Sequence, residues 1–199
     1  MSKGTMALTT LDPNTALVLI DLQNGIVGSP ATPHSGPEVV TRGKELAEAF
    51  RNRGLQVVLV NVSFSSDLLD APTGRTEAPK MTALPPAGWD QIIDEFDAQQ
   101  CDLRVTKHNW GAFHGTDLDV QLRRRGITQI VLGGLATSIG VESTAREAHA
   151  HGYHVTLAVD AMSDRDPEMH RNSVERVFPR LGETGTTAEI IELLATTHA

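Results

Sequence analysis

The chain has 199 residues, of which 40% are hydrophobic and 21% are charged, and its formal net charge is −8. A chain of this size and composition can bury a hydrophobic core, so we expect a single domain over residues 1–199. The negative charge argues against nucleic acid as a partner, because phosphates are bound by clustered Lys and Arg, and the single cysteine, Cys101, excludes an intramolecular disulfide.

Apolar runs rich in β-branched residues predict the strands. These runs do not alternate polar and apolar residues, which is typical of strands that are covered on both faces, as in a parallel sheet. In chain order, the expected strands are 16–21, 56–62, a weaker run at 102–106, 128–133, 154–160 and a short run at 182–184.

Helical patterns fall between these strands. Strands that alternate with helices form right-handed βαβ units, so the sequence predicts an α/β protein of three layers with a doubly wound parallel sheet. Residues 63–89 hold four prolines, which predicts a long surface loop of the kind that forms lids or binding loops. The expected helices are 38–53, 116–125 with Thr116 as cap, 141–151, 167–178, and one from Thr186 or Thr187 to residue 194.

Two ionisable residues follow predicted strands on the same edge of the sheet. Asp21 ends the first strand, and Lys107 follows the run at 102–106. Ligands of open parallel sheets bind at the carboxyl ends of the strands. Burial raises the pKa of an Asp and a nearby ammonium lowers it, so such a pair is suited to proton transfer in a dry cleft. The alternatives are a structural ion pair or an Asp that caps a turn.

Three segments resemble the isochorismatase-like hydrolases in order and spacing, namely residues 16–24, 106–107 and 134–146. The resemblance covers the chain from about residue 15 to residue 194. It implies a six-stranded parallel sheet in the order 3-2-1-4-5-6, and it implies hydrolysis of amides by an Asp–Lys–Cys triad. Asp21 and Lys107 match the first two members of the triad, and Gly140 stands at the position of the third.

Glycine has no side chain, so covalent attack by residue 140 is excluded. Isochorismatases with glycine in this place cleave a vinyl ether: an Asp protonates the enol carbon, and water attacks the oxocarbenium ion. On this pattern Asp21 is the general acid, which favours a raised pKa, and Lys107 steadies a substrate carboxylate or water. We therefore expect a small-molecule hydrolase with a non-covalent mechanism. The alternatives are an amidase that uses activated water and a ligand-binding or regulatory pseudoenzyme.

Residues 110–126 and 137–146 resemble more closely a bacterial branch of the family that lacks the cysteine and includes the YecD protein. In relatives the turn before position 140 contains a cis peptide, which here implies a cis bond between Leu135 and Ala136. Backbone N–H groups in this turn are suited to hold an anion or a carbonyl oxygen, and the alternative is an ordinary strand-to-helix turn. Substrate contacts are expected from Leu135, Ala136, Thr137 and Ile139.

Other side chains are expected to touch substrate. Gln23 is expected to orient substrate or water, and the alternative is that it stabilises a turn. Phe64, Trp110 and Phe113 are expected to wall the pocket, with core packing or subunit contacts as the alternative.

No metal or other cofactor is expected. Nicotinamidase-like relatives hold a metal through an Asp-x-His pattern after the second strand, where residues 61–63 read Asn-Val-Ser. No apolar run approaches the ~20 residues that span a bilayer, and residues 1–10 lack the apolar core of a signal peptide, so we expect a cytoplasmic protein without a membrane partner. The resemblance implies a homodimer or a larger homo-oligomer.

Overall fold

The computed structural model describes residues 8–96 and 102–198, so Cys101 lies outside the described residues. Six strands within these ranges form one sheet, in which all neighbours are parallel and the order is β3-β2-β1-β4-β5-β6. The predicted sheet and its strand order are confirmed. The strands are β1 (Thr15–Ile20), β2 (Gln56–Val62), β3 (Leu103–Lys107), β4 (Gln129–Leu135), β5 (His154–Ser163) and β6 (Glu183–Gly185).

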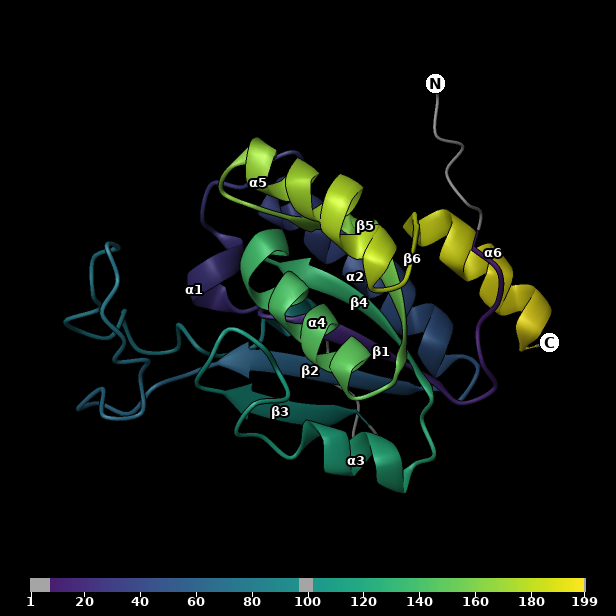
Figure 1. Ribbon diagram of the computed structural model, residues 1–199, viewed down its shortest axis with the longest axis horizontal. Coiled ribbons are helices and arrows are strands. Elements are labelled where there is room, and N and C mark those ends of the chain that lie inside the picture. Colours follow the sequence, from purple (N-terminus) through teal and green to yellow (C-terminus); the bar gives the residue numbers. More distant parts are fainter. Residues whose placement is uncertain (1–7, 97–101, 199) are drawn as a thin grey trace.

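Helices connect the strands and cover the sheet (Figure 1). The two longest, α2 and α6, each begin with a capping box, formed by Ser35 with Glu38 and by Thr186 with Glu189. The helices are α1 (Asn24–Val27), α2 (Gly36–Arg51), α3 (Leu118–Arg124), α4 (Glu142–Ala150), α5 (Pro167–Asn172) and α6 (Thr187–Thr197). Short turns are the 3-10 segments η1 (Asp94–Phe96) and η4 (Phe178–Arg180) and the π turns η2 (Thr137–Val141) and η3 (Ser173–Val177).

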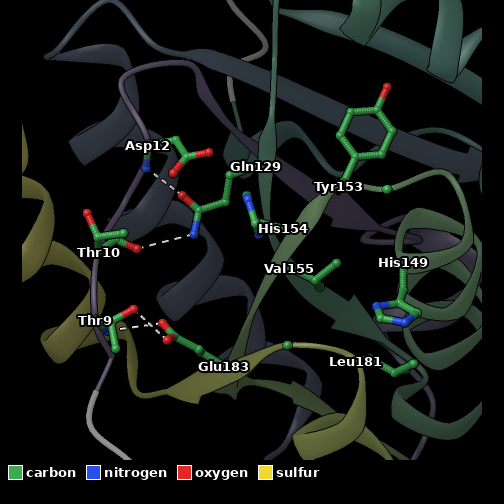
Figure 2. Close-up of a pocket in the computed structure, with 12 residues that line it drawn as sticks. Thr9, Thr10, Asp12, Gln129, His149, Tyr153, His154, Val155, Leu181 and Glu183 are labelled. Carbon is green, nitrogen blue, oxygen red and sulfur yellow. Dashed lines mark hydrogen bonds between the residues drawn. The ribbon is translucent and has the colours of Figure 1, made fainter.

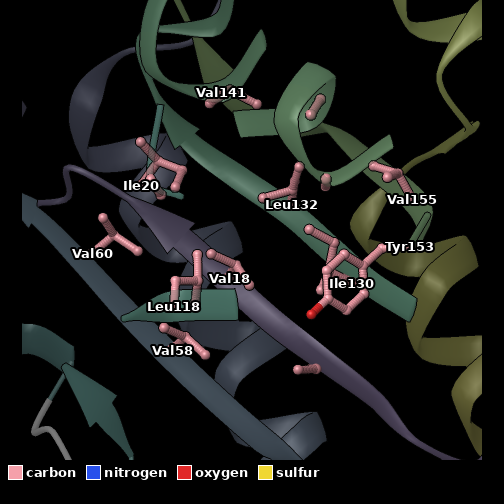
Figure 3. Packing of buried hydrophobic residues seen from close by; sticks show 14 of the residues in the cluster. Val18, Ile20, Val58, Val60, Leu118, Ile130, Leu132, Val141, Tyr153 and Val155 are labelled. Atoms are coloured by element: carbon pink, nitrogen blue, oxygen red, sulfur yellow. The ribbon is translucent and has the colours of Figure 1, made fainter. Parts of the chain in front are cut away.

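The sheet separates two layers of helices. Alternate residues of a strand point to opposite faces, so Val18 and Ile20 of β1 join the apolar cluster under α3 and α4, which Figure 3 shows. Leu17 and Leu19 join the second cluster, under α2 and α6. Because both faces are covered, β1 is buried along its whole length. This is why its sequence does not alternate polar and apolar residues.

The strand order places a topological switch point between β1 and β4, at the carboxyl ends of the strands. From β1 the chain builds β2 and β3 on one side, and it then crosses to build β4, β5 and β6 on the other. At such a switch point the connections after neighbouring strands diverge, and ligands bind between them. Asp21 follows β1 at this point and η2 follows β4.

The helix expected at 141–151 is confirmed as α4, and the π turn η2 precedes it. The helix expected at 167–178 is interrupted, because α5 is followed by the π turn η3 and the 3-10 segment η4. A π turn departs from the 3.6-residue period that predicts helices. The helix α3 begins at Leu118, after Asp117, and the Thr116 hydroxyl accepts the Leu118 N–H at 3.2 Å, as expected of the predicted cap, while it donates to the Ala112 carbonyl at 2.6 Å. The sequence did not predict α1 and η1.

Residues 63–88 extend from the end of β2 away from the sheet, without helix or strand (Figure 1). The predicted surface loop is therefore confirmed. Its base is held where the backbone N–H of Ser65 donates to Asp70 and where Phe64 stacks on Trp89 at 6.2 Å between ring centres. No helix of the described residues is long and apolar enough to cross a membrane.

Candidate active site

Asp21 follows the buried central strand directly. Its backbone has a φ of 52°, a left-handed conformation that Asp tolerates better than most residues. Its N–H donates to the Val60 carbonyl at 2.8 Å. The residue is 5% exposed, so its carboxylate is largely desolvated. The fold thus places this carboxyl group at the carboxyl end of the central strand, buried rather than on the surface.

Lys107 ends the edge strand β3 and reaches past the end of β2 to Asp21. Its Nζ donates to Asp21 Oδ2 at 2.8 Å and to the carbonyl of Asn109 at 3.0 Å, and the residue is 2% exposed. The other carboxylate oxygen, Asp21 Oδ1, is buried and has no hydrogen-bond partner among the described residues. An unpaired buried acceptor costs free energy unless water or a ligand satisfies it. Oδ1 is therefore the atom of this pair whose hydrogen-bonding capacity is unused among the described residues.

Burial raises the pKa of Asp21 from 3.8 to about 6, although the charge and the hydrogen bond of Lys107 act in the opposite direction. A carboxyl group with this pKa exchanges its proton near neutral pH, and such groups serve as general acids or bases. Lys107 stabilises the carboxylate that remains after proton transfer. The pair has the properties that the sequence predicts, and its catalytic role stays a prediction.

Gly140 lies in the π turn η2 and faces the same carboxylate. A Cβ atom added at this position would lie 3.3 Å from Asp21 Oδ2, 2.9 Å from Ile20 Cγ2 and 3.4 Å from the Leu135 carbonyl. The three residues that the triad pattern selects are therefore adjacent in space. The predicted cis peptide between Leu135 and Ala136 is confirmed.

Hydrogen bonds to β5 and α5 hold the turn around Gly140. The Thr137 hydroxyl is 2.8 Å from His170 Nδ1, and burial, with a contribution from His34, lowers the pKa of that imidazole. The Ser138 N–H donates to Asp164 at 2.7 Å, and Asp164 is 2% exposed. The sequence did not predict Asp164 or His170 as part of the site, because only the return of the chain through β5 brings them to η2.

The residues that the sequence predicts as substrate contacts lie partly in the turn before Gly140 and partly in the buried interior. Leu135 and Thr137 are buried in the turn before Gly140, and Ala136 and Ile139 are half-buried there. Gln23 is fully buried, and its side-chain amide donates to the carbonyls of Val62 and Trp89 and accepts the Val62 N–H. These bonds agree with the turn-stabilising alternative for Gln23.

The three predicted aromatic walls lie in different environments. Phe64 is half-buried and lies 6.4 Å from the His108 ring. Phe113 is 6% exposed and packs in the core, where it stacks on His151 at 5.2 Å. Trp110 is 64% exposed. Contact with substrate stays a prediction for all three residues, and the core alternative describes the position of Phe113.

The place of the metal site in nicotinamidase-like relatives is filled by internal hydrogen bonds. Asn61 donates to the Asp90 carbonyl at 3.0 Å and accepts from the Thr106 hydroxyl at 2.9 Å, and Ser63 donates to the Asp90 carboxylate at 2.6 Å. Across residues 8–96 and 102–198, no three His, Cys, Asp or Glu side chains form a group that could hold a metal ion.

A cavity of about 470 Å³ lies at the opposite, amino-terminal edge of the sheet (Figure 2). Most polar groups in its wall are paired with one another. Gln129 accepts the Asp12 N–H and donates to the Thr10 carbonyl, and Glu183 accepts both the N–H and the hydroxyl of Thr9. These bonds attach residues 9–12 to the sheet, so the polar groups around this cavity hold the fold together. The cavity is remote from Asp21 and Lys107.

Comparison with known proteins gives one consistent result. The family model described as the isochorismatase domain matches residues 15–189. The chain is 44% identical to the isochorismatase family protein YecD of Escherichia coli O157:H7, with 90% of this chain and 96% of that protein covered. It is 47% identical to the isochorismatase family protein YwoC of Bacillus subtilis, with 89% and 93% covered.

Two solved structures are similar over most of their length. An isochorismatase family protein from Burkholderia thailandensis matches with a TM-score of 0.90 and 47% identity, with 94% of this chain and 98% of that chain covered. The N-carbamoylsarcosine amidase from Thermoplasma acidophilum matches with a TM-score of 0.72 and 30% identity, with 87% and 96% covered.

Proposed function

The chain belongs to the isochorismatase family, whose members are hydrolases that include amidohydrolases, and we propose that it hydrolyses a small molecule through Asp21 and Lys107 without a covalent intermediate. The observation that carries this proposal is the state of the Asp21 carboxylate. One oxygen is bound by Lys107, and the other is buried and unpaired. The absence of a side chain at Gly140 leaves neither a thiol nor a hydroxyl there to attack a substrate.

We propose vinyl-ether cleavage as the specific reaction. Protonated Asp21 gives its proton to the enol carbon, which produces an oxocarbenium ion and leaves Asp21 as a carboxylate beside Lys107. Water adds to the cation and loses a proton, and the hemiketal then breaks into an alcohol and a carbonyl compound. The pKa of about 6 supports this role, because a fraction of Asp21 is protonated near neutral pH. Lys107 lowers the free energy of the carboxylate that forms.

The second candidate is amide hydrolysis by activated water. It is favoured by the 30% identity to a protein that is named an amidase. In this reaction Asp21 must be ionised, so that it can take a proton from water. The two reactions therefore require opposite protonation states of the same carboxyl group.

The pH dependence of kcat/KM distinguishes these reactions. On carboxylated enol ethers, general-acid catalysis by Asp21 predicts a rate that falls about tenfold per pH unit above about 6. On carboxylated amides, general-base catalysis predicts a rate that falls by the same factor below about 6. Asp21→Asn is expected to abolish either activity, and Glu192→Gln, which removes an exposed carboxylate on α6, is the matched control.

A third outcome would end the hydrolase proposal. If members of either substrate class raise the melting temperature of the protein but none is hydrolysed, the site binds ligands without chemistry. Equal ligand binding by the wild type and by Asp21→Asn would support that conclusion further. A ligand-binding or regulatory role would then replace catalysis.

We also propose that the protein works as a homodimer or a larger homo-oligomer. Exposed apolar side chains support this: Leu69 in the loop after β2 is 82% exposed, and Trp110 is 64% exposed. Exposed apolar side chains mark contact surfaces where they form a contiguous patch, so the proposal requires these two to lie within one interface. Light scattering after size-exclusion chromatography is expected to give a mass of at least twice 21.4 kDa, and a monomer at every protein concentration would contradict the proposal.

A further inference from the structure

A single hydroxyl group joins the two segments that lie on either side of Asp21. Thr144 belongs to α4, four residues after Gly140, and is fully buried. Its Oγ1 donates to the Gly140 carbonyl at 2.7 Å and accepts the N–H of Ala112 at 3.1 Å. The first bond is common for threonine in a helix. The second bond connects α4 to the loop that follows β3, 32 residues away in the sequence.

The loop after β3 is fastened to α4 at the adjacent residue as well. The Phe113 N–H donates to Glu147 Oε2 at 2.9 Å. A Cβ atom at Gly111 would displace the Glu147 carboxylate, so this contact depends on the absence of a side chain there. Through these contacts the loop lies directly against α4, and its distance from the helix is set by two side chains, Thr144 and Glu147.

The same loop holds the ammonium group of the site, because Lys107 Nζ donates to the Asn109 carbonyl at 3.0 Å. The hydrogen bonds run from Asp21 through Lys107, the loop and Thr144 to the Gly140 carbonyl, and Gly140 lies beside the same Asp21 carboxylate. We propose that Thr144 is a positioning residue, which fixes Lys107 and the turn at Gly140 on the two sides of Asp21 and so keeps water from the carboxyl group.

The chemistry of the hydroxyl explains why this position is sensitive. A hydroxyl can donate one hydrogen bond and accept others at the same time, and Thr144 uses both capacities in a place without solvent. A side chain that lacks the hydroxyl leaves the buried Ala112 N–H without its acceptor. The loop must then move toward water, and it carries the Asn109 carbonyl that orients Lys107. The charge of Lys107 lowers the pKa of Asp21. A movement of the loop therefore changes both the position of this charge and the access of water to the Asp21 carboxyl group.

The test follows Asp21 by carbon NMR of the labelled full-length protein. Thr144→Val keeps the shape of the side chain and removes both hydrogen bonds. We expect the pKa of Asp21 to move away from about 6, because water that reaches the carboxyl group lowers it and a Lys107 ammonium that moves away raises it. Thr144→Ser keeps the hydroxyl and is expected to titrate like the wild type.

Thr156→Val is the matched control. It removes a fully buried hydroxyl in β5 that accepts from Gln129 Nε2 at 3.1 Å, at the opposite end of the sheet. We expect this variant to have a lower melting temperature and an unchanged Asp21 titration. If Thr144→Val also loses stability but titrates like the wild type, Thr144 only stabilises the fold and the proposal is wrong. An equal change in Thr144→Ser would overturn it too, because the hydroxyl would not be the cause.

If Thr144→Val does not fold, Thr144→Ala lacks the same hydroxyl and is judged by the same two outcomes. The inference rests on the proposed role of Asp21, but the titration needs no substrate. An Asp21 titration that moves as expected, without turnover of any substrate, would end the hydrolase proposal and leave the positioning role intact. Turnover that depends on Asp21, with no change of the Asp21 titration in Thr144→Val, would support the hydrolase proposal and overturn the positioning role of Thr144.

Discussion

Replacing Lys107 by methionine isolates the two opposing effects on Asp21. Methionine has a similar length and carries no charge, so Lys107→Met removes the ammonium that lies 2.8 Å from Oδ2 and preserves most of the packing. Burial, which raises the pKa of Asp21, then acts alone. An opposite charge at this distance lowers a carboxyl pKa by ~1–3 pH units, so its loss is expected to raise the value from about 6 to ~7–9.

Carbon NMR of the labelled carboxyl group measures this change directly, and Lys44→Met, which removes an exposed ammonium from α2, is the control. In the vinyl-ether reaction the variant is expected to hold its proton at neutral pH but to lose rate, because the product carboxylate is no longer stabilised. An Asp21 titration at or below about 6 in Lys107→Met would refute the reasoning, because the ammonium would then not be lowering the value.

Two further predictions concern stability. Gly134→Ala is expected to lower the free energy of unfolding, measured in urea, by more than ~4 kcal/mol. Gly134 has a φ of 120°, and a Cβ atom there would collide with the main chain of Ile20. Gly28→Ala is the control and is expected to change the stability little, because the space around Gly28 is open. The pKa of Asp21 is raised in the folded state, so its contribution to stability is complete below about 4 and is lost as pH rises through about 6. The free energy of unfolding of the wild type minus that of Asp21→Asn is therefore expected to fall by ~2 kcal/mol between pH 4 and pH 7, and a rise over this range would contradict the burial of the carboxyl group.

The sequence predicts the sheet well because each buried strand is a continuous apolar run. The stretch at 16–21 can be recognised as a strand from its own residues, without knowledge of the neighbouring strands. In the structure the strand ends one residue earlier, at Ile20. The short helix α1 is different. Its four residues contain a glycine and no helical period, and its main-chain bonds to Trp89 and Gln91 come from a distant segment. Elements that depend on such contacts leave no local pattern.

Position at a strand end also predicts the core of the site. Asp21 and Lys107 lie at the carboxyl ends of β1 and β3, and a parallel sheet brings such ends to one edge. The unpaired Oδ1 and the contribution of Asp164 have no counterpart in the sequence. Asp164 reaches the site because its carboxylate accepts the Ser138 N–H of η2, and that contact exists only in the assembled fold.

The methyl group of Ile20 beside Gly140 also limits the evolution of the site. A cysteine at position 140 would bring its Cβ to 2.9 Å from Ile20 Cγ2, which is closer than such carbons pack. Ile20 also belongs to the core under α3 and α4, so making room through Ile20→Ala would cost ~2–5 kcal/mol. A cysteine at position 140 therefore requires the Ile20 side chain or the backbone of η2 to shift. The cysteine-free site and the apolar core under α3 and α4 are thus fitted to each other.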